Sequence, residues 1–273
     1  MIVIIIMLIL GVLAGMIGSL VGLGGGILIV PALTYLAEIV PAFHDVTPQI
    51  AIGTSLFVII FTGLSSTLSY MKYKLVDYKS GLIFFIGSGT GSVAGAYVSK
   101  GFHTDSFSLW FGIFMIAISL SLMLKRNQRS AEKKHVGMIR AFQENDGTVY
   151  TYSYRVWIGI SIALVVGFLG GLFGIGGGSL MVPAMILLFM FPPRVAIATS
   201  MFIIFLSSIT GSIAHIASGH VNWLFALCLV PGAWYGGKLG AYINRALKND
   251  ILVIMMRWVL VIIGLRMIFQ AIF

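Results

Sequence analysis

Charged residues are scarce in this chain of 273 residues: Asp, Glu, Lys and Arg make up 9% of it, whereas hydrophobic residues make up 59%. Soluble domains carry about 25% charged residues and about 45–50% apolar ones, so the composition excludes an ordinary soluble domain. Apolar stretches near the roughly 20 residues that cross a bilayer follow one another along nearly the whole chain. We therefore predict an all-α, polytopic, integral membrane protein.

Cysteine is also nearly absent, and the N-terminus has no basic region. The single cysteine, Cys228, lies inside an apolar stretch, where we expect it to serve as a small packing residue. No basic residue precedes the first apolar stretch, so we interpret it as a membrane span rather than a cleaved signal peptide. We expect no cofactor, no metal site, no catalytic residue and no nucleic-acid partner.

Acidic residues are missing from the membrane segments, because we place all eight of them outside the apolar stretches. No carboxylate is then available there to bind Na⁺ or relay protons, although backbone carbonyls can coordinate Na⁺, and proton coupling stays open. The charged residues within the stretches are the cations Lys238, Arg257 and Arg266. Lys238 and Arg257 either face the bundle interior as functional groups or extend to the membrane interface.

The apolar stretches divide into two groups of five, separated by a polar linker. In the first group we predict segments at 2–21, 26–40, 50–71, 80–100 and 106–124. In the second group they are 156–173, 178–192, 196–218, 222–243 and 251–272. The chain is thus predicted to have a membrane repeat at 1–124, a linker at 125–155 and a second repeat at 156–273. Asp146-Gly147 before alternating β-formers predicts a small hairpin in the linker, which we interpret as a cytoplasmic connector.

Glycine marks the duplication most clearly. Residues 15–33 and 167–185 are identical at eleven of nineteen positions, at an offset of 152. At an offset of 145, Ala51-Ile-Gly-Thr-Ser55 matches Ala196-Ile-Ala-Thr-Ser200. The same offset aligns two four-residue glycine patterns, Gly87, Gly91 and Gly95 with Gly232, Gly236 and Gly240. Such spacing favours close helix packing in lipid.

Basic residues alternate between loops and predict the orientation. They follow the third, fifth, seventh and ninth segments, at Lys72, Lys74, Lys79, Lys125, Arg126, Arg129, Lys133, Lys134, Arg140, Arg194, Arg245 and Lys248. Basic loops belong in the cytoplasm. If each half makes an odd number of crossings, the halves are inverted repeats with both chain termini outside.

The glycine runs interrupt apolar segments and predict broken or re-entrant helices at the centre of the bundle. Gly22-x-Gly24-Gly-Gly26 lacks the Lys-Ser/Thr and soluble context of a phosphate-binding loop. Irregular backbone at membrane depth is tolerated where protein buries it or where it lines a cavity. New helices are predicted to start near Ile27 and Ser179, and two opposed helix N-termini would form an anion site. Alternatively, the glycines only permit tight helix crossing.

The candidate substrate-binding residues come from the breaks, from the repeated Thr-Ser pairs and from two of the cations. They are Gly22, Gly24, Gly25, Gly26, Thr54, Ser55, Gly174, Gly176, Gly177, Gly178, Thr199, Ser200, Lys238 and Arg257. The hydroxyls of the Thr-Ser pairs either donate to the substrate or bond back to the preceding helical turn.

The doubled core Gly-x-Gly-Gly-Gly-x-Leu-x-Val-Pro, which ends at Pro31 and Pro183, resembles the TauE/SafE sulfite exporter family, as does the Ala-x-x-Thr-Ser that follows in both halves. The resemblance covers essentially the whole chain. It implies a permease of the cell inner membrane for a small sulfur-containing anion: sulfite, sulfoacetate or another sulfonate, or thiosulfate. It carries the family motif over to the glycines and prolines of both breaks and leaves the direction of transport and the oligomeric state open.

Three competing functions remain. The chain could transport another small organic anion. A membrane-embedded enzyme would need paired carboxylates, a Ser/His/Asp set or a metal cluster within the spans, which the acid-free segments disfavour. A structural or sensor protein would keep the packing glycines but show no flux.

Overall fold

Long apolar helices make up most of the structure. The computed structural model describes residues 2–99, 109–110, 112–113, 115–117, 119–120, 137–143 and 149–272. The first half contains α1 (Ile2–Val21), α2 (Gly26–Ile39), a 3₁₀ turn (Pro41–Phe43), α3 (Pro48–Met71) and α4 (Tyr78–Val98). The second contains α6 (Val156–Phe173), α7 (Met181–Leu187), α8 (Pro193–Ala217), α9 (Trp223–Ala246) and α10 (Asn249–Ile272). The predicted segment 106–124 and the linker's basic start lie largely outside the described residues.

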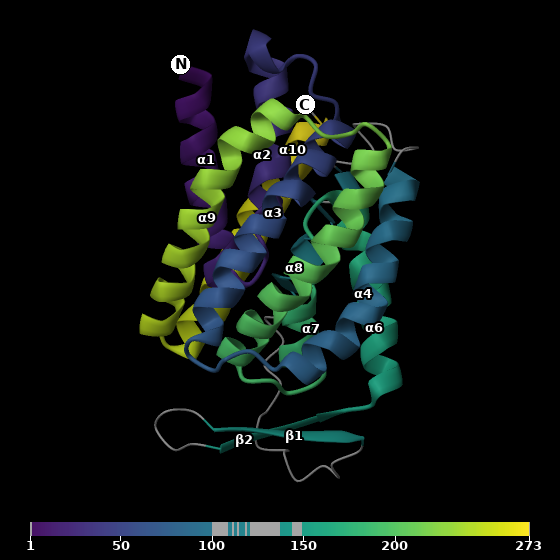
Figure 1. Ribbon diagram of the computed structural model, residues 1–273, viewed down its shortest axis with the longest axis vertical. Helices are drawn as coiled ribbons and strands as arrows, with labels where there is room; N and C mark the ends of the chain where they lie inside the picture. The colour runs from purple at the N-terminus through teal and green to yellow at the C-terminus, as the bar shows by residue number, and fades with distance from the viewer. Residues whose placement is uncertain are drawn as a thin grey trace.

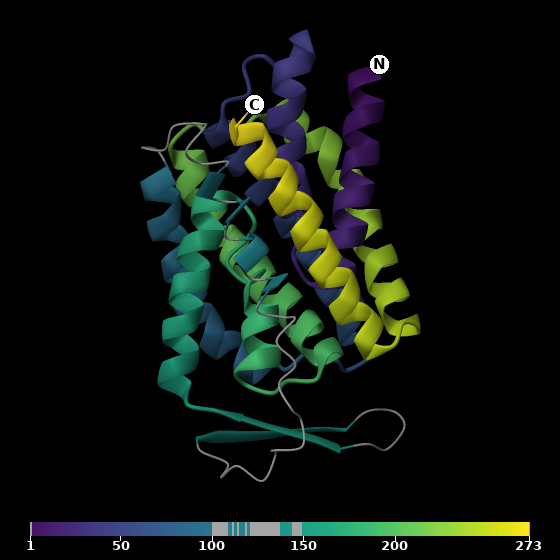
Figure 2. The same ribbon diagram turned by 180° about the vertical axis from the view of Figure 1, so that it is seen from behind.

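Six of the described helices are long and apolar enough to cross a membrane: α1, α3, α4, α6, α8 and α10. The predicted all-α polytopic membrane fold is therefore confirmed. Both chain termini lie at one end of the helical body and the linker hairpin lies at the other (Figures 1 and 2).

Two helical hairpins turn back inside this body. The first, α1–α2, enters from the end that holds the termini and returns to it, and the second, α6–α7, enters from the opposite end (Figure 1). The turns require glycine, because the backbone is left-handed at Gly25 (φ 90°) and Gly176 (φ 79°), a conformation that other residues rarely adopt. The glycine runs thus break the helices, as expected.

The helices after the breaks differ from the prediction in length. We expected them to start at Ile27 and Ser179, but α2 begins at Gly26 and α7 at Met181. The segment predicted at 178–192 contains only the seven-residue α7, whereas α2 has 14 residues. Pro183 lies in the first turn of α7, but Pro31 lies in the second turn of α2, where its missing N–H leaves a carbonyl of the preceding turn without its usual donor.

The most extensive helix pairs combine one helix from each half: α1 with α9, and α4 with α6. The two glycine patterns lie in these interfaces. A methyl group at Gly91 of α4 would lie 2.7 Å from the Phe168 nitrogen of α6, and one at Gly236 of α9 would lie 2.9 Å from the Met16 nitrogen of α1. The glycines therefore let the backbones touch, as the four-residue spacing predicted.

The remaining pairings connect these helices into one body. Helix α3 packs on α9, helix α8 packs on α4, and α3 and α8 pack on each other to a similar extent. We group α1, α3 and α9 as unit A and α4, α6 and α8 as unit B. The two units meet where α3 packs against α8, and there a methyl group at Gly63 would lie 3.1 Å from the Phe205 Cβ. Unit A carries the first glycine break and unit B carries the second.

The linker contains the predicted hairpin. Strands β1 (Met138–Gln143) and β2 (Val149–Tyr154) pair antiparallel, with Met138 opposite Tyr154 and Gln143 opposite Val149. Asp146-Gly147, on which the prediction rested, lies outside the described residues. Helix α6 follows β2 almost directly, so the hairpin is attached to the start of the second repeat.

Candidate functional site

The two glycine breaks lie side by side in the centre of the protein. A methyl group at Gly26 would lie 2.9 Å from the Ile175 Cα, so the backbones of the two breaks are in contact. Two isoleucines that match at the offset of 145, Ile59 and Ile204, lie against both breaks. Both are fully buried. The structure therefore brings together the two segments that the duplication singled out.

Each break contacts equivalent residues of the opposite half. A methyl group at Gly22 would lie 2.9 Å from Val182 Cγ2 and 3.1 Å from Ile197 Cα. One at Gly174, which aligns with Gly22, would lie 3.0 Å from Val30 Cγ2 and 2.8 Å from Ile52 Cα. Because Val30 aligns with Val182 and Ile52 with Ile197, the contacts repeat with the halves exchanged.

The serines of the Thr-Ser pairs hold these breaks in place. Ser55 Oγ donates a hydrogen bond of 2.9 Å to the Gly174 carbonyl, and Ser200 Oγ donates one of 2.9 Å to the Gly22 carbonyl. The Gly178 carbonyl of the same half lies 2.8 Å from Ser200 Oγ and is an alternative acceptor for the same proton. The bonds to Gly174 and Gly22 cross between the halves rather than returning to the preceding helical turn. They satisfy carbonyls that the broken helices cannot satisfy themselves.

The threonines of the same pairs anchor the starts of two other helices. Thr54 Oγ1 accepts a hydrogen bond of 3.0 Å from the Asn222 N–H, and Thr199 Oγ1 accepts one of 3.0 Å from the Asp77 N–H. Asn222 and Asp77 are the N-caps of α9 and α4, and they align at the offset of 145. The serine hydroxyls therefore lie at the breaks and the threonine hydroxyls at the starts of α9 and α4, and all four bond to protein groups.

The two candidate cations lie on α9 and α10, and the contacts found for Lys238 among the described residues are with aromatic rings of its own helix rather than with a break. Lys238 is exposed on α9, with its Nζ 5.3 Å from the centre of the Trp234 ring and 5.9 Å from that of Tyr235. Arg257 is half-buried on α10, where its carbonyl accepts a hydrogen bond from Ser119 Oγ at 3.2 Å. We expected all acidic residues outside the apolar segments, but Glu38 lies in the last turn of α2 and Asp250 in the first turn of α10, which corrects their predicted positions.

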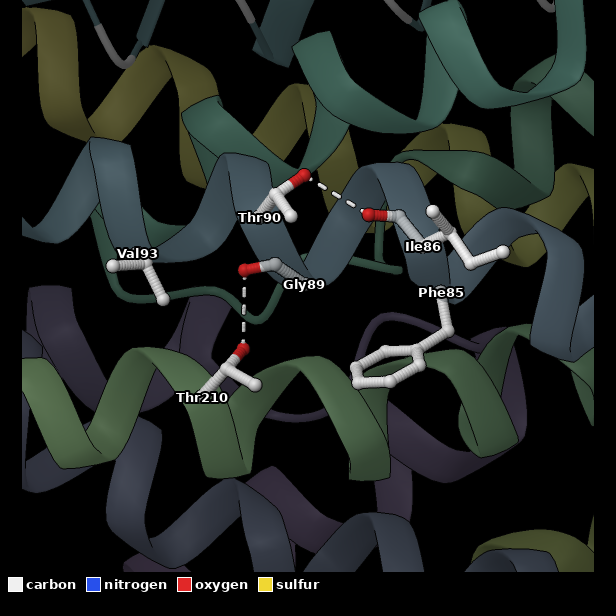
Figure 3. A pocket seen from close by; sticks show the side chains of 6 residues that line it. All are labelled: Phe85, Ile86, Gly89, Thr90, Val93 and Thr210. Carbon is white, nitrogen blue, oxygen red and sulfur yellow. Dashed lines mark hydrogen bonds between the residues drawn. The ribbon is translucent and has the colours of Figure 1, made fainter. Parts of the chain in front are cut away.

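A pocket opens along the seam between α4 and α8. Its lining consists of Phe85, Ile86, Gly89, Thr90, Val93 and Thr210 (Figure 3). Both of its hydroxyls are occupied: Thr90 Oγ1 donates to the Ile86 carbonyl at 2.9 Å, and Thr210 Oγ1 lies 2.8 Å from the Ser207 carbonyl and 3.2 Å from the Gly89 carbonyl. The pocket has an apolar lining and offers no charged group to an anion.

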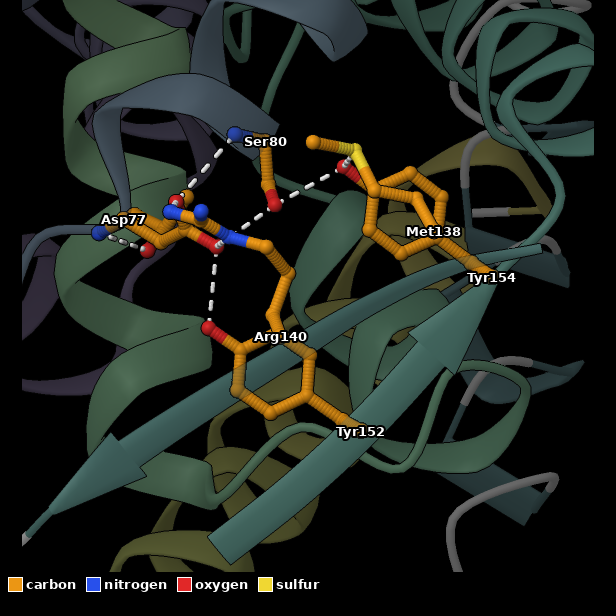
Figure 4. Close-up of polar contacts among 7 residues, drawn as sticks. Asp77, Ser80, Met138, Arg140, Tyr152 and Tyr154 are labelled. Atoms are coloured by element: carbon orange, nitrogen blue, oxygen red, sulfur yellow. Dashed lines mark hydrogen bonds and ion pairs between the residues drawn. The ribbon is translucent and has the colours of Figure 1, made fainter. Parts of the chain in front are cut away.

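A buried carboxylate at the opposite end from the termini ties the linker hairpin to α4. Asp77 is 6% exposed, and its two oxygens lie 2.6 Å from Arg140 Nη2 and 3.2 Å from Arg140 Nε (Figure 4). The Tyr152 hydroxyl donates to the same carboxylate at 2.9 Å, and Ser80 Oγ does so at 2.5 Å. Burial alone would raise the pKa of Asp77, but the hydrogen bonds from Arg140, Ser80 and Tyr152 hold that pKa below its usual value.

Aromatic rings extend this attachment to the end of the second re-entrant hairpin. The Tyr152 ring centre lies 3.9 Å from that of Phe191, and the Tyr154 ring centre lies 5.4 Å from that of Phe189. Phe84 of α4 packs on Tyr154 at 4.9 Å. The hairpin thus fastens α4 to the chain that returns from the second break. The sequence showed Asp77 before an apolar segment, but nothing in it paired Asp77 with Arg140, 63 residues away.

Comparison with known proteins agrees with this architecture. The model of the family described as Sulfite exporter TauE/SafE matches residues 7–267. The probable membrane transporter protein YunE of Bacillus subtilis is 68% identical over 269 residues, which cover 98% of each chain. A probable membrane transporter protein of Methanocaldococcus jannaschii is 30% identical over 96% of this chain and 94% of its own. No solved structure matches.

The Asp77 carboxylate makes the stability of the protein depend on pH. Because its pKa is lowered in the folded state, its contribution is present above the pKa of an unfolded aspartate, about 3.9, and is lost as the pH falls through the folded value. We expect Asp77→Asn to lower the free energy of unfolding at pH 7 by roughly 1–3 kcal/mol and to flatten the acid-induced fall of the thermal midpoint measured between pH 7 and pH 3. Asp250→Asn, which changes an exposed carboxylate on α10, serves as control. A wild-type acid profile in Asp77→Asn would contradict this assignment.

Proposed function

Because the chain belongs to the sulfite exporter TauE/SafE family, we propose that it transports a small sulfur-containing anion across the cell inner (plasma) membrane. Sulfite, sulfoacetate or another sulfonate, and thiosulfate are the candidate substrates. The observation that carries the proposal is the contact between two glycine-broken hairpins in the buried centre of the protein. Transporters made of two repeats place their substrate where discontinuous helices meet.

The charges near the breaks suit an anion better than a cation. Helix α2 starts at the first break, and the N-terminus of a 14-residue helix carries a partial positive charge of about half an elementary unit. The described part of the two breaks contains no acidic side chain that would repel an anion, and the nearest ones in sequence lie at helix ends: Glu38 in the last turn of α2 and Asp77 at the N-cap of α4. Neutral backbone and hydroxyl donors would therefore supply most of the binding.

The hairpin end of the protein faces the cytoplasm in this proposal. The α3–α4, α7–α8 and α9–α10 loops all lie at that end (Figure 1). The loops, the adjoining helix ends and the hairpin carry the basic residues Lys72, Lys74, Arg140, Arg194, Arg245 and Lys248. The positive-inside rule assigns such loops to the cytoplasm. Both termini are then outside, and the two halves, whose re-entrant hairpins enter from opposite ends, are inverted repeats.

The exchanged helix pairs support a mechanism in which the site opens alternately to the two sides of the membrane. The glycine-lined contacts α1–α9 and α4–α6 make each unit stiff, because the packed backbones leave no room to slide. We assign the motion to the α3–α8 contact, where units A and B meet. Rocking about this contact would expose the breaks first to one side of the membrane and then to the other.

Counterflow in proteoliposomes tests the substrate class. We expect labelled sulfite, sulfoacetate or thiosulfate to accumulate in vesicles preloaded with the same unlabelled anion, and not in protein-free vesicles. Lactate and succinate serve as organic anions without sulfur. Robust flux of a carboxylate together with no flux of any sulfur anion would replace the proposed substrate class by the competing one, and no flux of any solute would favour a structural or sensor role.

Two engineered disulfides test the moving contact, both in a Cys228→Ser background. Gly63→Cys with Phe205→Cys links α3 to α8, where the Cβ positions lie 3.1 Å apart. Ser65→Cys with Gly237→Cys links α3 to α9 inside unit A, where they lie 3.4 Å apart. These separations are somewhat below the roughly 3.8 Å of a disulfide, so small shifts are needed in both pairs. We expect oxidation to block counterflow in the first variant, reversibly with reductant, and to leave the second active. Full activity of the oxidised first variant would refute the assignment.

A further inference from the structure

Buried hydroxyl groups collect on one side of the second glycine break. Ser88 and Ser92 lie one turn apart on α4, and Ser208 and Ser212 lie one turn apart on α8; each is at most 1% exposed. None of the four Oγ atoms has a hydrogen-bond partner among the residues that the structure describes. Buried polar groups are nearly always hydrogen-bonded, so four such hydroxyls at one helix seam point to a ligand that they bind.

Three hydroxyl-bearing residues lie directly against the break. A methyl group at Gly176 would lie 3.0 Å from Ser208 Oγ. One at Gly177 would lie 3.0 Å from Ser207 Oγ and 3.0 Å from the Ser88 carbonyl. Ser207 Oγ makes only a long bond, 3.3 Å, to the Ile204 carbonyl of its own helix, so its proton can turn toward a stronger acceptor.

The residues directly against the first break are apolar. A methyl group at Gly24, which aligns with Gly176, would meet Ile204 Cγ2 at 3.0 Å and Ile59 Cγ2 at 3.3 Å. At the offset of 145, Ser88 aligns with Ala233 and Ser208 with Gly63, neither of which carries a hydroxyl, whereas Ser207 and Ser212 align with the buried hydroxyls of Thr62 and Thr67. The two breaks therefore differ in the residues that touch them and in the hydroxyls of Ser88 and Ser208.

The hydroxyls on the two sides of the α4–α8 seam differ in their hydrogen bonding. Thr90 and Thr210, on the side with the pocket, bond to carbonyls of α4 and α8 (Figure 3). Ser88 and Ser208 lie on the buried side, and Ser92 and Ser212 continue the line one turn further along α4 and α8. Both helices run from the hairpin end toward the end that holds the termini (Figure 1), so the line leads from the second break toward that end.

We propose that Ser88, Ser207 and Ser208, with the backbone of Gly176 and Gly177, form an anion-binding subsite at the second glycine break. It takes a small oxyanion with several acceptor oxygens, held by neutral hydroxyl donors in a site of low dielectric constant, where each such bond is strong. Ser92 and Ser212 line the route between this subsite and the end of the protein that holds the termini. This subsite rests on the proposed transport function and places its substrate beside one break rather than symmetrically between the two.

Binding and stability measured together on purified protein test the subsite. The variants are Ser88→Ala, Ser208→Ala and the double variant, with Thr90→Val as a control that removes a bonded hydroxyl from the same seam. Titration with sulfite, sulfoacetate and thiosulfate, followed by the ligand-induced rise of the thermal midpoint, gives the dissociation constant. We expect it to rise about tenfold in each single variant, as for the loss of one hydrogen bond to a charged group, and to stay within about twofold of wild type in Thr90→Val.

The ligand-free protein supplies the readout that separates binding from structure. Removing a buried hydroxyl without a partner should leave the thermal midpoint unchanged or raise it, because active sites trade stability for function. A hydroxyl with a purely structural role would lower the midpoint on removal and leave the dissociation constant unchanged. Wild-type affinity in the double variant would overturn the subsite while the transport function stands. A wild-type protein that neither binds nor transports any sulfur anion would overturn the proposed function itself.

Discussion

Backbone polar groups inside a membrane must be hydrogen-bonded within the protein, and this constraint shapes the centre of the molecule. Two helices break at glycines in left-handed conformation, which leaves carbonyls without their usual partners. Ser55 and Ser200 donate to the carbonyls of Gly174 and Gly22, each in the opposite half. The duplicated halves therefore complete each other, and neither break would be satisfied alone. Burying two irregular segments against each other lowers the stability of the fold, and a functional role of this contact would account for that cost.

The same exchange between halves recurs in the packing. Helices α1 and α9 come from different halves yet touch through Gly236, and α4 and α6 do so through Gly91. The units that we propose to move are thus not the sequence repeats but groups of helices built across them. In our account this exchange gives each unit one break and lets the units move about the α3–α8 contact. The linker hairpin reinforces unit B, because Asp77, Arg140 and Tyr152 fasten α4 to the chain returning from the second break.

The sequence predicted the membrane fold, the breaks and the linker hairpin, because apolar length, glycine runs and Asp-Gly are local signals. The short α7 could also have been predicted: the offset between the halves falls from 152 to 145 after the breaks, and α7 is seven residues shorter than α2. The exchanged helix pairs could not be predicted, since the glycine patterns indicate close helix packing but not which helix is the partner. The pairing of Asp77 with Arg140 and the hydroxyls of Ser88 and Ser208 depend on contacts across long stretches of sequence. Nothing in the local pattern set those serines apart from other hydroxyls in apolar helices.

The position of the bound anion is the most direct test of the account, because the account places the substrate where the two breaks meet, on the side of the second break. Selenite, a heavier analogue of sulfite, can be located in crystals of the protein by its anomalous scattering. We predict a selenium peak within hydrogen-bond reach of Ser208 Oγ and the backbone of Gly176 and Gly177. A peak beside Lys238 on the exposed face of α9, with none at the breaks, would contradict the central claim.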